Sequence, residues 1–288
     1  MDQLDDAIDC GGEYFSGCKQ NQLYWYRSED EVGRPVLFIH SVNAAPSAIE
    51  LKPLFKHFQV SRPVFAPDLP GFGRSERDVG EFGPADFAGE IAAMIESLAG
   101  DQAPDVVALS LGCEFLARAI TDFGAKVRSV TFISPTGFSA RGTPSKKAQQ
   151  RLKKILGFAG LGRNAFKLLR TERSIRYFYG MNFSGFIPNE LVTYALKTTK
   201  APNAHLMPLQ FLSMGLFTEN AVENLYQRLD LPVLVIFDRD PNVSFEGFAD
   251  FEHAANWRFE RVAPSLGMPQ WEHPEETASA IENFYAEL

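Results

Sequence analysis

The chain has 288 residues, of which 45% are hydrophobic and 22% are charged, as is usual for a soluble globular protein. No apolar run reaches the roughly 18 residues of a membrane-spanning helix, and the acidic start of the chain lacks the features of a signal peptide. The formal net charge of −8 argues against general nucleic-acid binding.

The three cysteines are too few for a disulfide framework and lack the spacing of metal ligands. Cys10 and Cys18 flank a glycine-rich stretch and could pair, but a reducing cytoplasm is the simpler expectation. We therefore expect a cytoplasmic protein without a metal or other cofactor.

Short apolar runs alternate with helical patterns along most of the chain. Their continuous hydrophobicity predicts strands buried on both faces of a parallel sheet, at 35–39, 64–66, 106–109, 130–133, 232–237 and 257–262. An aromatic segment at 22–27 predicts a further strand near the start. Apolar residues at helical spacing predict helices over 87–98 and 278–288, with Pro274 in the first turn of the last helix. The pattern indicates an α/β fold.

The segment 139–228 interrupts this alternation with helical patterns alone, so we expect a helical cap inserted after the fourth buried strand. We assign 1–138 and 229–288 to the α/β core and 139–228 to the cap. Between 141 and 176 there are eleven Lys or Arg and one acid, a net charge of +10, so the remainder carries −18. An apolar stripe runs from Ala148 to Ala159 opposite a basic face that includes Lys147 and Lys154. This face is either solvated or a contact with an anionic lipid surface or an acidic partner.

The strand at 106–109 leads into Ser110 through a strand–turn–helix pattern. Small residues, Ala108 and Gly112, stand two positions before and two after Ser110. In such a nucleophile elbow the turn is too tight for bulky neighbours, and it lifts the serine hydroxyl above the sheet. A strand end with a polar cap has the same local pattern, so other motifs must decide between the two.

Five motifs in order make the chain resemble the α/β-hydrolase superfamily, in particular its bacterial members with a cap. Besides the elbow they are the segment from His40 after the first buried strand, the loop Asp68-Leu-Pro-Gly-Phe-Gly-Arg-Ser75, Asp240 after the penultimate strand, and the entry to the last helix at 268–275. The resemblance implies an α/β-hydrolase fold over nearly the whole chain.

By this resemblance Ser110 is the nucleophile, and the backbone N–H groups of Val42 and Leu111 form the oxyanion hole. Asp240 is the acid that orients a base, with Asp238 as the alternative. Ser41 occupies a position where the family usually has glycine, so the shape of the oxyanion loop is open.

The base is missing from its usual place. Gly267 occupies the position at which the family carries the catalytic histidine, and Gln270 follows Pro269. Neither glycine nor glutamine can take the serine proton. His273 is the nearest substitute in sequence, although its position at the start of the last helix favours a cap or a surface residue. His205 lies in the cap and could approach Ser110 from above. We expect His40, His57 and His253 to be structural or exposed.

We therefore expect a serine esterase or acyl hydrolase acting on a small-to-medium apolar substrate, with an incomplete triad. The alternative is a catalytically inactive member of the fold that binds a hydrophobic ligand or a protein partner. Non-hydrolytic chemistry at the oxyanion hole is a third option. Aromatic, leucine and methionine residues of the cap either pack it on the sheet or line an apolar cavity, and those we considered are Phe166, Leu168, Leu169, Tyr177, Phe178, Tyr179, Phe183, Phe186, Phe211, Met214 and Phe217.

Overall fold

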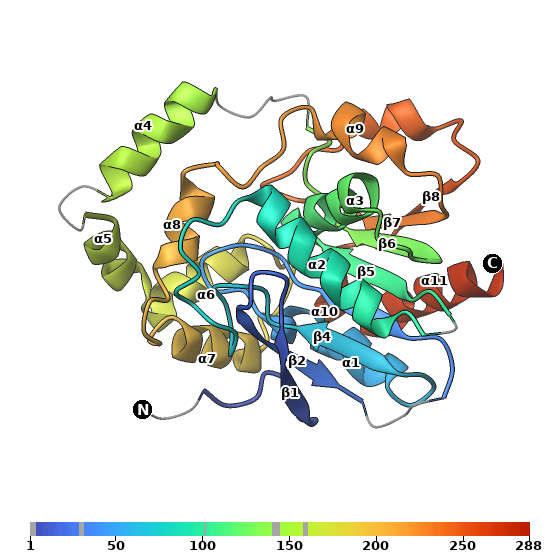
Figure 1. Ribbon diagram of the computed structural model, residues 1–288, viewed down its shortest axis with the longest axis horizontal. Helices are drawn as coiled ribbons and strands as arrows, with labels where there is room; N and C mark the ends of the chain where they lie inside the picture. The colour runs from blue at the N-terminus through green and yellow to red at the C-terminus, as the bar shows by residue number, and fades with distance from the viewer. Residues whose placement is uncertain (1–3, 29–31, 101, 140–144, 158–160) are drawn as a thin grey trace.

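An eight-stranded sheet forms the centre of the computed structural model, which describes residues 4–28, 32–100, 102–139, 145–157 and 161–288 (Figure 1). The strand order is β1-β2-β4-β3-β5-β6-β7-β8. The pairings from β4 to β8 are parallel, whereas β1 and β2 are antiparallel. The strands are β1 (Gly12–Ser16), β2 (Gln22–Arg27), β3 (Val36–Ile39), β4 (Val64–Pro67), β5 (Asp105–Leu109), β6 (Ser129–Ile133), β7 (Val233–Phe237) and β8 (Trp257–Arg261).

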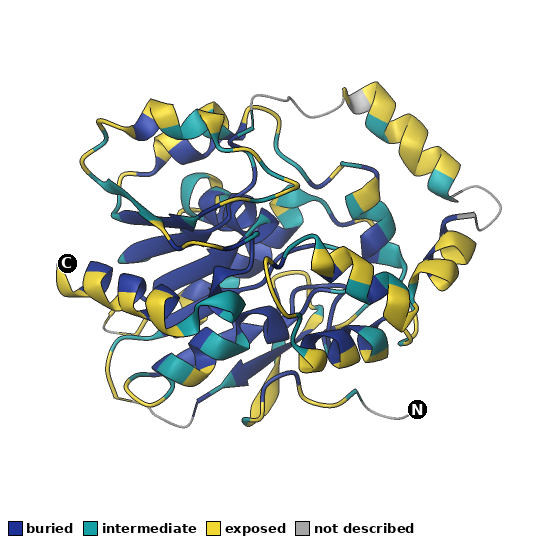
Figure 2. Cartoon of the chain, turned by 180° about the vertical axis from the view of Figure 1, so that it is seen from behind, coloured by how far each residue is buried: buried dark blue, intermediate teal, exposed yellow. Residues whose placement is uncertain are grey.

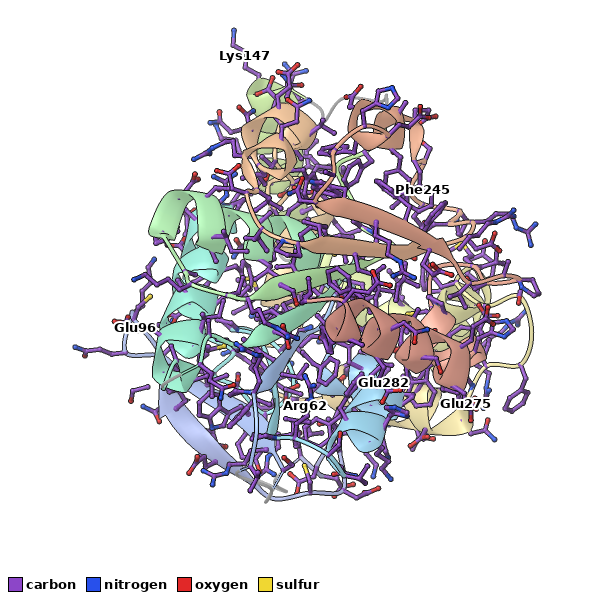
Figure 3. All side chains as sticks on the ribbon, turned by 90° about the vertical axis from the view of Figure 1, so that its right-hand side faces the viewer. Arg62, Glu96, Lys147, Phe245, Glu275 and Glu282 are labelled. Atoms are coloured by element: carbon purple, nitrogen blue, oxygen red, sulfur yellow. The ribbon has the colours of Figure 1, made fainter. Side chains whose placement is uncertain are left out.

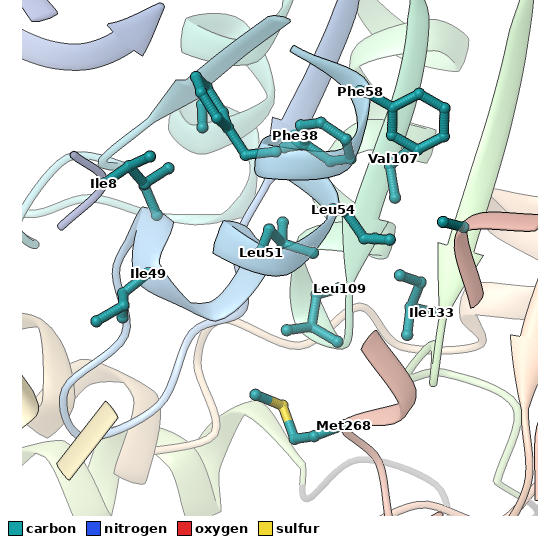
Figure 4. Packing of buried hydrophobic residues seen from close by; sticks show 14 of the residues in the cluster. Ile8, Phe38, Ile49, Leu51, Leu54, Phe58, Val107, Leu109, Ile133 and Met268 are labelled. Carbon is teal, nitrogen blue, oxygen red and sulfur yellow. The ribbon is translucent and has the colours of Figure 1, made fainter. Parts of the chain in front are cut away.

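Helices cover both faces of the sheet, and alternate strand residues face each layer. On one face Val107 and Leu109 of β5 pack in one cluster with Leu54 and Phe58 of α1 (Figure 4). Ile281 of α11 belongs to the same cluster. On the other face Val106 packs with residues of α2 and α3. The core helices are η1 (Ala48–Leu51), α1 (Lys52–Phe58), α2 (Pro84–Leu98), α3 (Leu111–Phe123), η4 (Glu246–Phe251), α10 (Pro269–Glu272) and α11 (Pro274–Ala286).

In the described chain between β6 and β7 every regular element is a helix, as the sequence predicts. Its elements are α4 (Lys146–Gly157), α5 (Leu161–Leu169), α6 (Glu172–Gly180), α7 (Asn189–Thr198), α8 (Leu206–Leu212), α9 (Ala221–Asn224) and η3 (Tyr226–Arg228). We call these elements the helical insertion. Ala159 and residues 140–144, near the predicted start of the cap, lie outside the described residues.

The predicted fold class is confirmed: a mostly parallel sheet flanked by helices, with the helical insertion after the fourth buried strand. All seven predicted strands are present. The strand that the sequence pattern did not single out is β1, whose residues are mostly exposed at the edge of the sheet, so it lacks the apolar signal of a buried strand.

Buried strands and exposed insertion helices contrast clearly in Figure 2. In the described part of the chain, no helix is both long and apolar enough to cross a membrane. The three cysteines are free, and Cys113 is buried.

Candidate active site

Ser110 occupies the turn between β5 and α3, at the carboxyl edge of the sheet. Its backbone has φ +53° and ψ −120°, a conformation that non-glycine residues rarely adopt and that costs about 1–3 kcal/mol. The Ser110 N–H donates to the Ile133 carbonyl of the neighbouring strand, at 2.9 Å. A Cβ atom on Gly112 would lie 2.6 Å from the His40 carbonyl oxygen, so this position requires glycine. Close backbone packing therefore explains the glycine that the sequence pattern indicated at 112.

The loop after β3 brings Val42 to the same place. Val42 and Leu111 both line the cavity that contains Ser110. Leu111 is the first residue of α3, and the amides of a first helical turn have no intrahelical acceptor. The two residues of the predicted oxyanion hole thus line the same cavity as Ser110.

Ser41, which replaces the usual glycine, is tied to a buried carboxyl group. The Ser41 amide and hydroxyl donate to Glu50 Oε2 at 3.0 and 2.7 Å, and Asn43 Nδ2 donates to Glu50 Oε1 at 2.7 Å. Burial raises the pKa of Glu50 to about 6, although these donors act to lower it. The serine therefore fixes the shape of the loop that carries Val42.

Glu50 also lines the cavity, and our sequence analysis missed it. The signal was a single acid in the otherwise apolar run Ala48–Leu51, where a fully buried carboxyl group needs a specific reason. Tyr179 Oη is buried in the same cavity lining and has no hydrogen-bond partner within the described structure.

His40 has a structural role. Its Nε2 accepts a hydrogen bond from the Leu69 N–H at 2.8 Å, so its Nδ1 carries the proton and donates to the Ser41 carbonyl at 2.6 Å. Burial lowers the pKa of His40 to about 4. The ring therefore stays neutral and links the β3 loop to the segment after Pro67.

The Asp68–Ser75 motif is structural too. Asp68 is buried and accepts hydrogen bonds from the Ala48 and Arg74 amides. Gly73 packs directly on the Asp68 carboxyl group, so a side chain at 73 would collide with it. The motif therefore stabilises the loops beside the site, and none of its residues lines the cavity.

Asp240 follows β7 and faces the position that lacks a histidine. A Cβ atom on Gly267 would lie 2.8 Å from Asp240 Oδ2 and 3.6 Å from Asn182 Oδ1. The other carboxyl oxygen, Asp240 Oδ1, accepts from the Asn242 N–H at 2.7 Å. Burial raises the pKa of Asp240 to about 6. The predicted acid and the predicted vacancy are thus neighbours, and both line the cavity.

Gly267 has φ +103°, in the region that favours glycine. A histidine there would be strained by its own backbone and crowded by Asp240. The loop conformation at 267 therefore favours glycine over histidine.

Asp238, the alternative acid, does not line the cavity. Arg261 Nε donates to its Oδ1 at 2.7 Å, and the Ser265 N–H donates to its Oδ2 at 2.9 Å. Although burial alone would raise the pKa of Asp238, these partners lower it. Asp238 holds the loop that leads to Gly267.

None of the five histidines, all of which lie in described parts of the chain, lines the cavity. His273 Nε2 lies 2.9 Å from the Pro264 carbonyl oxygen, at the start of α11, so it is not positioned to take the Ser110 proton. In the insertion, Arg163 Nε donates to His205 Nε2 at 3.2 Å. His57 pairs with Glu282, and His253 is exposed. The structure therefore offers no substitute histidine.

The cavity has a volume of about 400 Å³ and apolar walls from α5, α6 and α8. Its charged lining residues are Glu50, Arg170 and Asp240. Six of the aromatic or aliphatic residues considered above line it, namely Phe166, Leu169, Phe178, Tyr179, Phe211 and Phe217. Leu168, Tyr177 and Phe186 are instead exposed, which corrects the expectation that they face inward. In the described residues no cluster of His, Cys, Asp and Glu could hold a metal ion.

Known structures share this architecture. A serine hydrolase involved in carbazole degradation (CarC enzyme) superposes with a TM-score of 0.77 at 15% identity, over 96% of this chain and 99% of its own. A thermophilic esterase from Thermogutta terrifontis gives 0.73 at 16% identity, over 96% and 99%. A meta-cleavage product hydrolase from Pseudomonas fluorescens gives 0.72 at 13%, over 96% and 98%. At these identities the superpositions establish the shared fold.

A comparison with curated protein sequences found no match. The profile of the alpha/beta hydrolase family, however, matches residues 36–280, which is most of the chain. This range contains the elbow, the loop after β3, Asp240 and Gly267. The chain therefore belongs to the alpha/beta hydrolase family.

Proposed function

We propose that the protein is a serine acyl hydrolase that acts on small-to-medium apolar esters or related acyl compounds. The observation that carries this proposal is Ser110, held in a strained turn against a 400 Å³ cavity with apolar walls. Strain of this kind persists where function requires it. The cavity volume suits a small ligand and its few polar groups suit an orienting role.

In the proposed reaction the Ser110 Oγ attacks the acyl carbon of the substrate. The N–H groups of Val42 and Leu111 donate to the oxygen on which negative charge develops, and each such donor contributes about 3 kcal/mol. The acyl group is transferred to Ser110, the leaving group departs, and water then releases the acid.

Asp240 takes the place of the absent imidazole as proton acceptor. It faces Gly267 rather than a histidine, so we propose that the Ser110 proton reaches its carboxylate through a bridging water. The same proton then passes to the leaving group. Because burial raises the pKa of Asp240 to about 6, this carboxylate is a better base near neutral pH than an ordinary aspartate.

The likeness to proteins described as a serine hydrolase and an esterase supports the acyl chemistry. The absence of histidine from the cavity lining within the described chain favours one rival, a protein that binds an apolar ligand without turning it over. The two functions differ in whether Ser110 is activated.

A fluorophosphonate probe with mass spectrometric mapping tests the proposal. We expect Ser110 to be labelled above about pH 6, where Asp240 is ionised, and labelling to be abolished by Ser110→Ala. A protein that folds, binds an apolar dye in the cavity and stays unlabelled at every pH would overturn the hydrolase proposal in favour of ligand binding.

A further inference from the structure

Helices α4 and α5 form a basic arm at the outer edge of the molecule (Figure 1). Together they contain seven Lys or Arg and no acid. Lys153 pairs with Glu81, whereas Lys147, Lys154 and Lys167 form no ion pair within the described structure. Lys147 points away from the body of the molecule (Figure 3). The positive charge of this arm is therefore largely uncompensated.

The same arm exposes apolar side chains. Ile155 on α4 is 54% exposed and Leu168 on α5 is 78% exposed. Tyr177 on the next helix, α6, is 67% exposed. Helix α4 packs mainly against α5 and α8, and it is exposed along nearly its whole length (Figure 2). Exposed large apolar side chains on consecutive helices are typical of an interaction site.

Part of the cavity lining is exposed on the helical insertion. Leu169 on α5, Phe178 on α6 and Leu212 on α8 line the cavity, and each is also at least 40% exposed. The apolar wall of the cavity thus continues onto the outside of the insertion, beside the basic residues.

We propose that the basic, apolar face of α4–α6 docks on an anionic lipid bilayer, so that the cavity opens toward the membrane. Lysines attract the anionic headgroups while Ile155, Leu168 and Tyr177 enter the headgroup–acyl boundary, as in interfacial amphipathic helices. The acyl region of a bilayer supplies an apolar partner for these side chains directly beside the anionic headgroups that match the lysines. The docking surface stands independently of catalysis, whereas delivery of a membrane-held acyl substrate to Ser110 rests on the proposed function.

Vesicle flotation tests the surface directly. The protein should bind vesicles of phosphatidylglycerol and phosphatidylcholine in equal parts at low salt, and pure phosphatidylcholine far more weakly. High salt should release it, because salt screens the lysine charges. Lys147→Glu/Lys154→Glu should weaken binding by at least about 30-fold, and Leu168→Ser by about 10-fold.

Lys56→Glu/Lys126→Glu is the matched control, since it reverses two exposed charges in the α/β core. It should leave vesicle binding within about 2-fold of wild type. Equal loss in the control, or no binding to anionic vesicles at low salt, would refute the membrane surface. A change in oligomeric state by Lys147→Glu/Lys154→Glu, with vesicle binding intact, would instead assign the face to a second copy of the chain.

Two further measurements separate this proposal from the hydrolase proposal. Ser110→Ala should bind vesicles like wild type, because the nucleophile is not on the docking surface. Lys147→Glu/Lys154→Glu should hydrolyse a short water-soluble ester at the wild-type rate. Vesicle binding without any hydrolysis by wild type would defeat only the proposed function, and hydrolysis without vesicle binding would defeat only the docking surface.

Discussion

Two turns at the carboxyl edge of the sheet, one at Ser110 and one at Gly267, both have positive φ. They differ in whether the residue with positive φ carries a side chain. Ser110 keeps φ +53° with a side chain, although glycine would relieve the strain. Gly267 reaches φ +103° without a side chain, and Asp240 lies against it. The first turn thus carries the hydroxyl of the proposed nucleophile, whereas the second favours glycine over any larger residue.

The difference bears on two interpretations of position 267. In one the site has only lost a side chain, and in the other the surrounding structure is adapted to glycine. A simple His-to-Gly change would leave open space and an unstrained backbone at 267. Instead the backbone requires glycine, the Asp240 carboxyl group occupies the space beside it, and burial raises the Asp240 pKa to about 6. We interpret this end of the site as adapted to work with a carboxyl group alone.

The largest expected effect is on catalysis at the first turn. Ser110→Ala should lower kcat for a soluble aryl ester by at least about 1,000-fold, because no other nucleophile is proposed. Ser110→Gly should be equally inactive but about 1 kcal/mol more stable than Ser110→Ala, since it relieves the positive φ. Steady-state kinetics and urea unfolding measure the two quantities. Substantial hydrolysis by Ser110→Ala would remove the nucleophile assignment.

Asp240→Asn should reduce kcat/KM by about 100-fold or more, because it removes the proton acceptor. In wild type the activity should rise as pH increases through about 6, when Asp240 loses its proton. The pH–rate profile of the variant should lack that step. If the profile of the variant kept a step with the same midpoint, the step would belong to another titrating group, with Glu50 as the first candidate.

The same variant has a stability signature. The folded-state pKa of Asp240 is raised from 3.8 to about 6, so its contribution to stability is present below about pH 4 and is lost as pH rises through about 6. A shift of this size corresponds to up to about 3 kcal/mol. The difference in free energy of unfolding between Asp240→Asn and wild type should therefore favour the variant more at about pH 8 than at about pH 5. An equal difference at both pH values would contradict the raised pKa.

Restoring a histidine at the second turn should fail. Gly267→His should give no increase in esterase activity and should lower the free energy of unfolding by about 1–3 kcal/mol, because of the positive φ and the crowding by Asp240. Gly267→Ala is the control for backbone strain without an imidazole. A rise in activity specific to the histidine would show that the loop relaxes and that the vacancy is incidental.

The smallest effect is expected at the oxyanion loop. Glu50→Gln removes the buried charge while keeping the size of the side chain, so kcat/KM should fall by less than about 10-fold. Stability should fall by about 1 kcal/mol, because an amide replaces a carboxylate that accepts three hydrogen bonds. A loss as large as that of Asp240→Asn would make Glu50 part of the catalytic machinery.

Much of the fold follows from short-range patterns in the sequence. Strands buried on both faces are apolar without interruption, and the elbow needs small residues within two positions of Ser110, so both leave local signals. The helical insertion follows from the loss of strand patterns after β6. The resemblance of the sequence to the family also predicts that Gly267 stands at the position of the catalytic histidine, because the residue type at a motif position can be read without coordinates.

The tertiary structure decided which distant groups meet. Glu50 and Ser41 are nine positions apart, and Asp240 and Gly267 are twenty-seven apart, yet each pair is in contact. Helical periodicity alone could not tell Leu169, which lines the cavity, from Leu168, which is exposed. The reason is physical: local propensity fixes elements and turns, whereas burial, pKa and backbone φ at the site depend on packing between segments far apart in the chain.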